Sequence, residues 1–131
     1  MQKGLFAMDI RIDEVKNIAY IKFTGKASSK DILEAFDKAV LSEKYQKGMG
    51  RLWDFTEIDL TLLESDVIPE MARYSLKFPE GIRDVKVAFV VSKSLEYGLT
   101  RMFQTYSEMY AKSQVRIFDS IDNAEKWMRV N

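Results

Sequence analysis

The 131-residue chain contains neither cysteine nor histidine. Without cysteine it has no disulfide, no thiolate nucleophile and no thiolate metal site. Without histidine it lacks the side chain most often used as a general base near neutral pH and as a metal ligand. Only carboxylate, lysine, tyrosine or serine chemistry remains, or magnesium or calcium held by carboxylates. We therefore expect no enzyme, no catalytic residues, no cofactor and no metal site.

An excess of charge of one sign and a long apolar run are also missing. Twenty basic residues balance twenty acidic ones. A nucleic-acid-binding protein normally presents a basic face, because neutralisation of phosphates dominates its affinity, so we expect no nucleic-acid partner. No apolar run approaches the roughly 20 residues of a membrane span, so we expect no membrane insertion. The absence of cysteine is compatible with a reducing compartment, and we expect a cytoplasmic location.

The composition that is present is that of an ordinary globular domain, with 47% hydrophobic and 31% charged residues. The length suits one domain. We expect residues 1–7 to form a short N-terminal arm and residues 8–131 to form a single domain. A start of the chain at Met8 is an open alternative to a start at Met1.

Patterns of strands and helices alternate along the chain. Alternating apolar residues predict strands at 8–15 and 18–24, which the turn at Lys16 and Asn17 joins into an antiparallel hairpin. The further expected elements are a helix after Ser28 or Ser29, a strand at 50–55, a helix after Ser65, a strand at 85–91, a helix from 95 to about 111, a strand at 114–118 and a helix after Asp119 and Ser120.

This order, β-β-α-β-α-β-α-β-α, predicts an α/β fold. Strands that alternate with helices imply parallel crossovers, and the opening hairpin adds one antiparallel pair. The run at 85–91 is almost continuously apolar, which is typical of a central strand buried on both faces. We expect a mixed sheet of about five strands flanked by helices.

Several short segments together resemble a known family. They are Ile21-Lys22-Phe23-Thr24-Gly25, Leu52-Trp53-Asp54-Phe55, Lys86-Val87-Ala88-Phe89-Val90-Val91, Tyr97-Gly98-Leu99-Thr100-Arg101-Met102 and Val115-Arg116-Ile117-Phe118-Asp119. With the element order, they resemble the SpoIIAA-like proteins, which are relatives of the STAS (sulfate-transporter and anti-sigma-factor-antagonist) domains. The resemblance covers residues 8–130.

The resemblance implies a small non-enzymatic domain that binds proteins or ligands. It also implies a phosphorylatable serine at the start of the helix after the third strand, within an aspartate-serine-serine-glycine motif. Ser65 lies near that position, but the second serine and the glycine are absent, and Glu64 and Asp66 would oppose an added phosphate. Ser65 is therefore a candidate phosphosite, with a helix cap as the favoured interpretation.

Polar side chains follow three of the expected parallel strands, where α/β domains usually bind ligands. They are Asp54 and Thr56, then Ser92, Lys93 and Ser94, and finally Asp119 and Ser120. The middle group combines a helix N-terminus with two hydroxyls and a lysine, which suits an anion. Simple helix capping by Ser92 or Ser94 is the competing interpretation. A magnesium site between Asp54 and Asp119 is less favoured than ordinary strand-end and capping roles.

The helix expected at 95–111 carries more apolar side chains than one core-facing stripe needs. We consider as its candidate interaction surface Tyr97, Arg101, Met102, Phe103, Tyr106, Met109 and Tyr110. Methionine and aromatic side chains suit a protein partner, a dimer face or an apolar ligand. A helix packed deeply against the sheet is the alternative.

The leading hypothesis from sequence is a non-enzymatic binding or regulatory module for a protein partner, including a second copy of itself in a homodimer. The alternative is a domain that binds or carries a small molecule or lipid. An enzyme that uses Asp54, Lys93 and Tyr97 is the third and weakest hypothesis.

Overall fold

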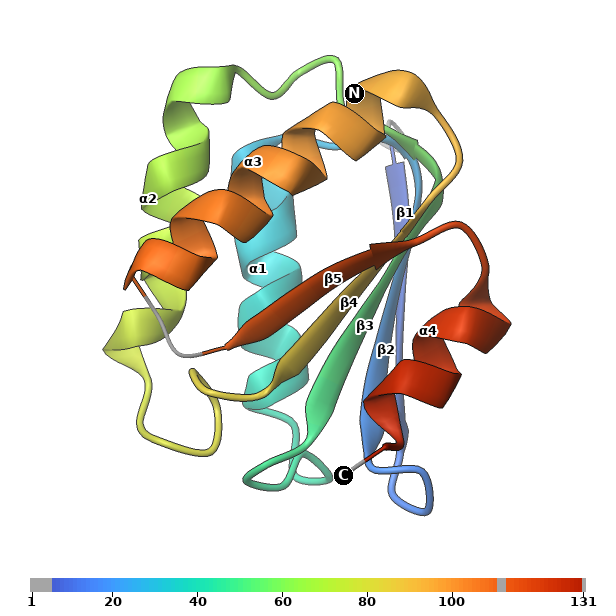
Figure 1. Cartoon of the computed structure of the whole chain (residues 1–131), viewed down its shortest axis with the longest axis vertical. Helices are drawn as coiled ribbons and strands as arrows, with labels where there is room; N and C mark the ends of the chain where they lie inside the picture. The colour runs from blue at the N-terminus through green and yellow to red at the C-terminus, as the bar shows by residue number, and fades with distance from the viewer. Residues whose placement is uncertain (1–5, 111–112, 131) are drawn as a thin grey trace, which may run out of the picture.

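The computed structural model describes residues 6–110 and 113–130 (Figure 1). The elements are β1 (Phe6–Asp13), β2 (Ile18–Lys26), α1 (Ser29–Val40), β3 (Gly50–Asp59), the 3-10 turn η1 (Ser65–Val67), α2 (Ile68–Tyr74), the 3-10 turn η2 (Ser75–Lys77), β4 (Lys86–Val91), α3 (Ser94–Tyr110), β5 (Gln114–Phe118) and α4 (Ile121–Met128).

The five strands form one mixed sheet whose spatial order is their order along the chain. β1 and β2 are the antiparallel hairpin, and β2 to β5 run parallel to one another. Asn17 in the hairpin turn has a φ of 62°, a left-handed conformation that asparagine tolerates. The predicted fold class and element order are confirmed.

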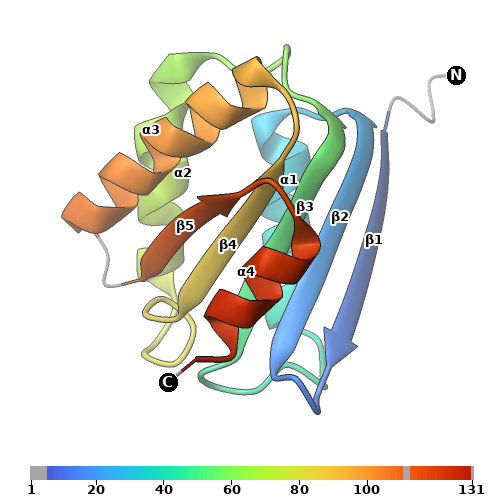
Figure 2. The ribbon, with the colours of Figure 1, turned by 45° about the vertical axis from the view of Figure 1, so that its right-hand side comes forward.

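Helices cover both faces of the sheet unequally. Figures 1 and 2 show α1, α2 and α3 on one face and α4 alone on the other. Side chains along a strand point alternately to the two faces, so Trp53 of β3 packs in the core under α1–α3, and Leu52 packs in the smaller core under α4. β4 is buried along nearly its whole length, as its apolar run predicted.

Polar groups fasten α4 to the sheet. Ser120 caps its first turn by accepting a hydrogen bond from the Asn123 amide at 3.1 Å. The Tyr20 hydroxyl donates to the Glu125 carboxylate, and the Lys86 ammonium donates to the Trp127 carbonyl at 3.0 Å. The positive charge of Lys86 beside the last turn of α4 also complements the negative end of the helix dipole. α4 is therefore held at both ends and along its inner side.

Two boundaries differ from the sequence-based expectation. β1 begins at Phe6, two residues before the expected start at Met8, and residues 1–5 of the expected arm lie outside the described residues. β3 runs to Asp59, four residues beyond the expected strand, because its second half pairs with the end of β2 after a shift in register, with Lys26 opposite Asp59.

None of the helices in the described part of the chain has the length and apolar content that crossing a membrane requires.

We predict that Tyr20→Phe lowers the free energy of unfolding by about 1.5 kcal/mol at pH 7, because it removes a hydrogen bond to a charged group. Burial, and then the neighbouring Glu125, raise the pKa of Tyr20 above its ordinary value of 10.0. Above pH 10 the unfolded chain therefore loses the Tyr20 proton while the native protein keeps it, so wild-type stability falls with rising pH. Urea titrations at pH 7, 10 and 11 should show the difference between wild type and variant narrowing above pH 10. A constant difference would contradict this assignment.

Candidate functional site

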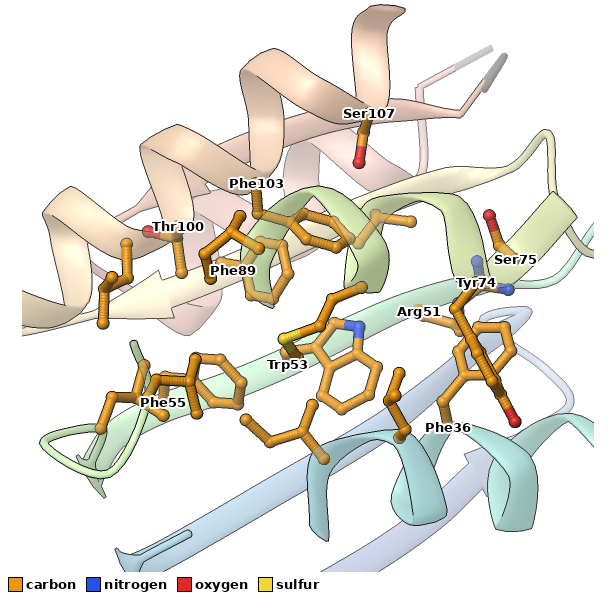
Figure 3. Close-up of a pocket in the computed structure, with 18 of the residues that line it drawn as sticks. Phe36, Arg51, Trp53, Phe55, Tyr74, Ser75, Phe89, Thr100, Phe103 and Ser107 are labelled. Atoms are coloured by element: carbon orange, nitrogen blue, oxygen red, sulfur yellow. The ribbon is translucent and has the colours of Figure 1, made fainter. Parts of the chain in front are cut away.

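An internal cavity of about 70 Å³ lies between the sheet and the α1–α3 layer (Figure 3). It is lined by Ile32, Leu33 and Phe36 of α1, Arg51, Trp53 and Phe55 of β3, Val87 and Phe89 of β4, Ile68, Met71 and Tyr74 of α2, Leu99, Thr100, Phe103 and Ser107 of α3, and by Leu60, Leu63, Ser75 and Ser113. Empty apolar volume costs stability at about 24 cal/mol per Å³, or roughly 1.7 kcal/mol here.

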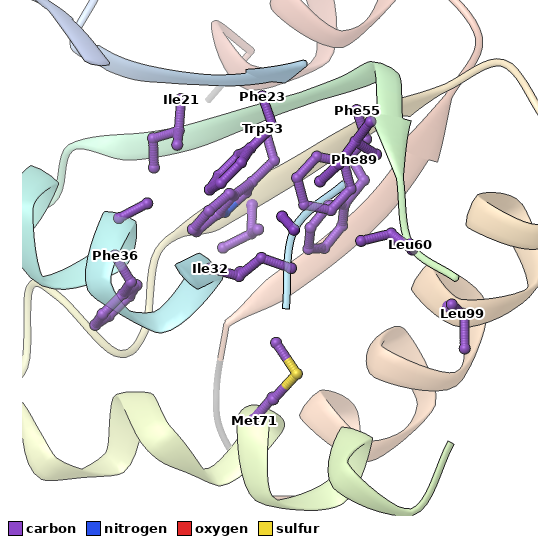
Figure 4. Close-up of a cluster of buried hydrophobic side chains, with 14 of the residues drawn as sticks. Ile21, Phe23, Ile32, Phe36, Trp53, Phe55, Leu60, Met71, Phe89 and Leu99 are labelled. Atoms are coloured by element: carbon purple, nitrogen blue, oxygen red, sulfur yellow. The ribbon is translucent and has the colours of Figure 1, made fainter. Parts of the chain in front are cut away.

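Aromatic rings form the floor of the cavity. Trp53 and Phe55 follow each other on the inner face of β3, with ring centroids 5.9 Å apart and planes at 62°. Phe89 of the neighbouring strand lies 5.4 Å from Phe55, and Phe103 of α3 meets Phe89 edge-on at 5.3 Å. Figure 4 shows these sheet rings facing the Met71 side chain of α2 across the core.

Arg51 places a charge at one end of this apolar cavity. Its side chain is on the inner face of β3 and the residue is only 3% exposed. Figure 3 shows it beside Tyr74 and Ser75. One terminal nitrogen, Nη1, donates to the Tyr45 hydroxyl at 2.8 Å and to the Ile82 carbonyl at 2.9 Å. The guanidinium carbon lies 4.7 Å from the centre of the Phe36 ring of α1, which is a cation–π contact.

No carboxylate compensates this buried charge among the described residues. Each ion pair found in that part of the chain joins other residues. Burial lowers the pKa of Arg51 below its ordinary value of 12.5, and the Tyr45 hydroxyl opposes that effect. Arginine stays protonated in proteins, so the cavity wall carries a positive charge.

Ser107 adds a second polar group on the opposite wall. The residue is 1% exposed, and Figure 3 shows its hydroxyl pointing from α3 toward the sheet. The nearby Thr100 hydroxyl donates to the Glu96 carbonyl at 2.8 Å. The cavity therefore presents one positive charge and several hydroxyl-bearing residues against a mainly apolar lining.

Glu96 and Lys93 fix the rim where β3 ends. The buried Glu96 carboxylate accepts a hydrogen bond from the Leu60 amide at 2.9 Å. The Lys93 ammonium donates to the Ile58 carbonyl at 2.9 Å. The first turn of α3 thus holds the chain that leaves β3, and so positions Leu60 and Leu63 at the cavity.

The predicted anion-binding residues line a separate open cleft at the carboxyl ends of β4 and β5. Ser92, Lys93 and Ser94 lie there with Tyr97 and Asp119. The structure thus brings two of the three predicted strand ends together. Lys93 is engaged at a carbonyl, and the Ser92 hydroxyl donates to the Thr56 carbonyl at 2.8 Å, so both side chains serve the neighbouring strand.

Asp54 does not belong to this cleft. Because β3 extends to Asp59, Asp54 lies inside the strand and not at its end, which corrects the expectation. Its carboxylate accepts hydrogen bonds from the Thr56 amide at 3.1 Å and the Thr56 hydroxyl at 2.7 Å. β4 separates Asp54 from the strand that precedes Asp119. Within the described residues, no group of three or more acidic side chains could hold a metal ion.

Ser65 is exposed and begins the 3-10 turn η1. Its side chain does not cap the following helix. The N-cap position of η1 is Glu64, and that of α2 is Val67, and neither makes a side-chain capping hydrogen bond. The capping interpretation of Ser65 is therefore wrong.

The predicted interaction residues of α3 divide between core and surface. Met102, Phe103 and Tyr106 are half-buried and pack against the main core, and Tyr110 is half-buried and stacks on Tyr106. The exposed members are Tyr97, Arg101 and Met109. The predicted surface is thus partly an inner surface, and Phe103 belongs to the cavity.

Sequence reasoning missed Arg51 and Ser107. A signal for Arg51 was present, because Arg51, Trp53 and Phe55 alternate on one side of an apolar strand. That spacing points the guanidinium to the same face as two core aromatic residues. Ser107 follows Phe103 by one helical turn, which places it on the buried side of α3.

A comparison of this chain with solved structures finds a similar fold. An uncharacterized protein of the DUF3478 family from Shewanella loihica PV-4, whose crystal structure is described as having a SpoIIAA-like fold, is similar over 98% of this chain and 98% of its own, with a TM-score of 0.60 and 19% sequence identity. No family model and no curated protein matches the sequence. The chain therefore has a SpoIIAA-like fold.

Proposed function

We propose that this protein is a non-enzymatic binding module that holds a small, mainly apolar molecule in the cavity between the sheet and α1–α3. The observation that supports this proposal is the cavity itself, which is lined by aromatic and aliphatic side chains. Protein interiors are normally close-packed, so unfilled volume of this kind lowers stability unless a ligand occupies it. The described polar groups near it are arranged for binding and offer no nucleophile paired with a base.

We predict that xenon, a neutral apolar probe smaller than benzene, raises the Tm of the wild-type protein in a pressure-dependent way, because a ligand that binds only the native state stabilises it. Ser107→Leu fills the cavity from α3 and should abolish the shift. Glu108→Leu, an exposed change on the same helix, should keep it. Native mass spectrometry of protein purified from cells would reveal a co-purified small molecule. An unchanged wild-type Tm at high xenon pressure, with a clean apo mass, would refute the proposal.

A protein partner is the second candidate function, and one flank of α3 favours it. Leu95, Met102 and Met109 recur every seven residues, which places them on one side of the helix. Leu95 is 45% exposed and Met109 is 68% exposed. Exposed methionine and leucine side chains in such a stripe suit an interface, including one with a second copy of the chain.

We predict that a self-associating protein would lose its dimer on Met109→Asp and on Leu95→Asp, because a charge cannot be buried unpaired in an apolar interface. Glu108→Arg, away from this stripe, is the control. Light scattering over a hundredfold range of protein concentration measures the mass. A wild-type monomer throughout that range would exclude the self-associating form.

A further inference from the structure

The charge at the end of the cavity indicates what kind of molecule fits there. Arg51 is 3% exposed and lines a cavity that is otherwise almost wholly apolar. A buried charge without an opposite charge strongly opposes folding, and in proteins such a group is normally paired. Among the described residues Arg51 has a hydroxyl, a carbonyl and a phenylalanine ring as neighbours, but no carboxylate.

Asp37, which follows the Phe36 ring that contacts Arg51, is engaged elsewhere. The Tyr74 hydroxyl donates to both carboxylate oxygens of Asp37, each at 2.9 Å. Asp37 forms no ion pair with Arg51. Its negative charge is thus bound by a phenol at the α1–α2 contact and does not neutralise the guanidinium.

Arg51 has further N–H groups with which it could bind a partner that carries two oxygens. A guanidinium carries five N–H groups, and the two on Nη1 suffice for the Tyr45 and Ile82 hydrogen bonds. The N–H groups of Nε and Nη2 have no partner in the described part of the chain. These two nitrogens form the planar fork that binds both oxygens of one carboxylate.

We propose, on the basis of the binding function proposed above, that the ligand is a monocarboxylate with a short apolar body, and that Arg51 pairs with its carboxylate while the aromatic lining holds the body. One buried positive charge neutralises one negative charge, so a monoanion fits and a dianion would bring an uncompensated charge into the cavity. The Ser107 hydroxyl offers a further donor from α3.

The volume of the cavity limits the apolar body. About 70 Å³ is less than half of the roughly 150 Å³ of an engineered cavity that binds benzene. A short aliphatic tail suits this space as it stands. The wall opposite the sheet includes α2, a seven-residue helix between two 3-10 turns, whose displacement would admit a longer tail.

The test compares an acid with its neutral amide of the same shape. Butanoate and butanamide, and then hexanoate and hexanamide, are titrated into the full-length protein at pH 7 by calorimetry. We expect each acid to bind the wild type at least about tenfold more tightly than its amide, because charge-assisted pairs to arginine are the stronger hydrogen bonds. Arg51→Met should remove this preference and keep the affinity for the amide. Arg101→Met, which removes an exposed arginine of α3, should leave the preference unchanged.

A second measurement needs no variant, so it holds even if Arg51→Met does not fold. In NMR spectra of the wild type, the Nε–H resonance of Arg51 should shift on addition of hexanoate, and by more than it does on addition of hexanamide, because the carboxylate forms the stronger, charge-assisted hydrogen bonds. Equal binding of acid and amide, an acid preference that persists in Arg51→Met, or an unmoved Arg51 resonance would each overturn the carboxylate assignment. If xenon or the amides bind in that case, the proposed binding function stands; if no probe binds, the binding function itself fails.

Discussion

Burial of β3 on both faces is the constraint on which the rest of this structure depends. A parallel strand inside a sheet must be covered from two sides, because its side chains point alternately to each. Trp53 and Leu52 are adjacent in sequence, yet they belong to different cores. The three helices on one side and the single helix on the other both follow from that alternation. The two sides differ in depth, and the cavity lies in the deeper one.

The cavity arises from the kind of side chain that β3 and β4 direct into the deeper layer. Trp53, Phe55 and Phe89 are rigid rings that meet at fixed angles. Arg51 lies on the same side of the same strand, so the spacing that aligns the rings also brings a guanidinium into the core. The buried positive charge therefore comes from a residue of the sheet.

The parts of the fold that were predictable from sequence are those determined by residues close together in the chain. Ser28 and Asp31 form the capping box of α1, and Ser120 caps α4, as their local sequences indicated. The alternation of apolar residues identified β1, β2 and β5, and the almost continuous apolar run identified β4. The position of Asp54 was not predictable in this way, because the length of β3 depends on pairing with β2 and on hydrogen bonds from the β4–α3 connection.

The candidate site was less accessible to sequence reasoning than the fold. The alternation of apolar residues around an arginine indicates the face of the strand on which the arginine lies. Whether an acidic side chain pairs with it depends on segments far away in the chain. Tyr45 and Ile82, the residues that contact Arg51, lie in two separate loops and carry no motif. The aromatic residues of α3 were noticed for their number, and only the packing shows which of them face inward.

The short, interrupted helix α2 gives the cavity two unlike walls. The sheet wall is tied by backbone hydrogen bonds on both sides of β3, whereas the chain opposite changes from a 3-10 turn to seven residues of α-helix and back again. Short segments with few internal hydrogen bonds open at lower free energy than the centre of a sheet. The rigid wall carries the charge and the softer wall determines the space. Such an arrangement selects the charged head group of a ligand and accepts apolar tails of different lengths.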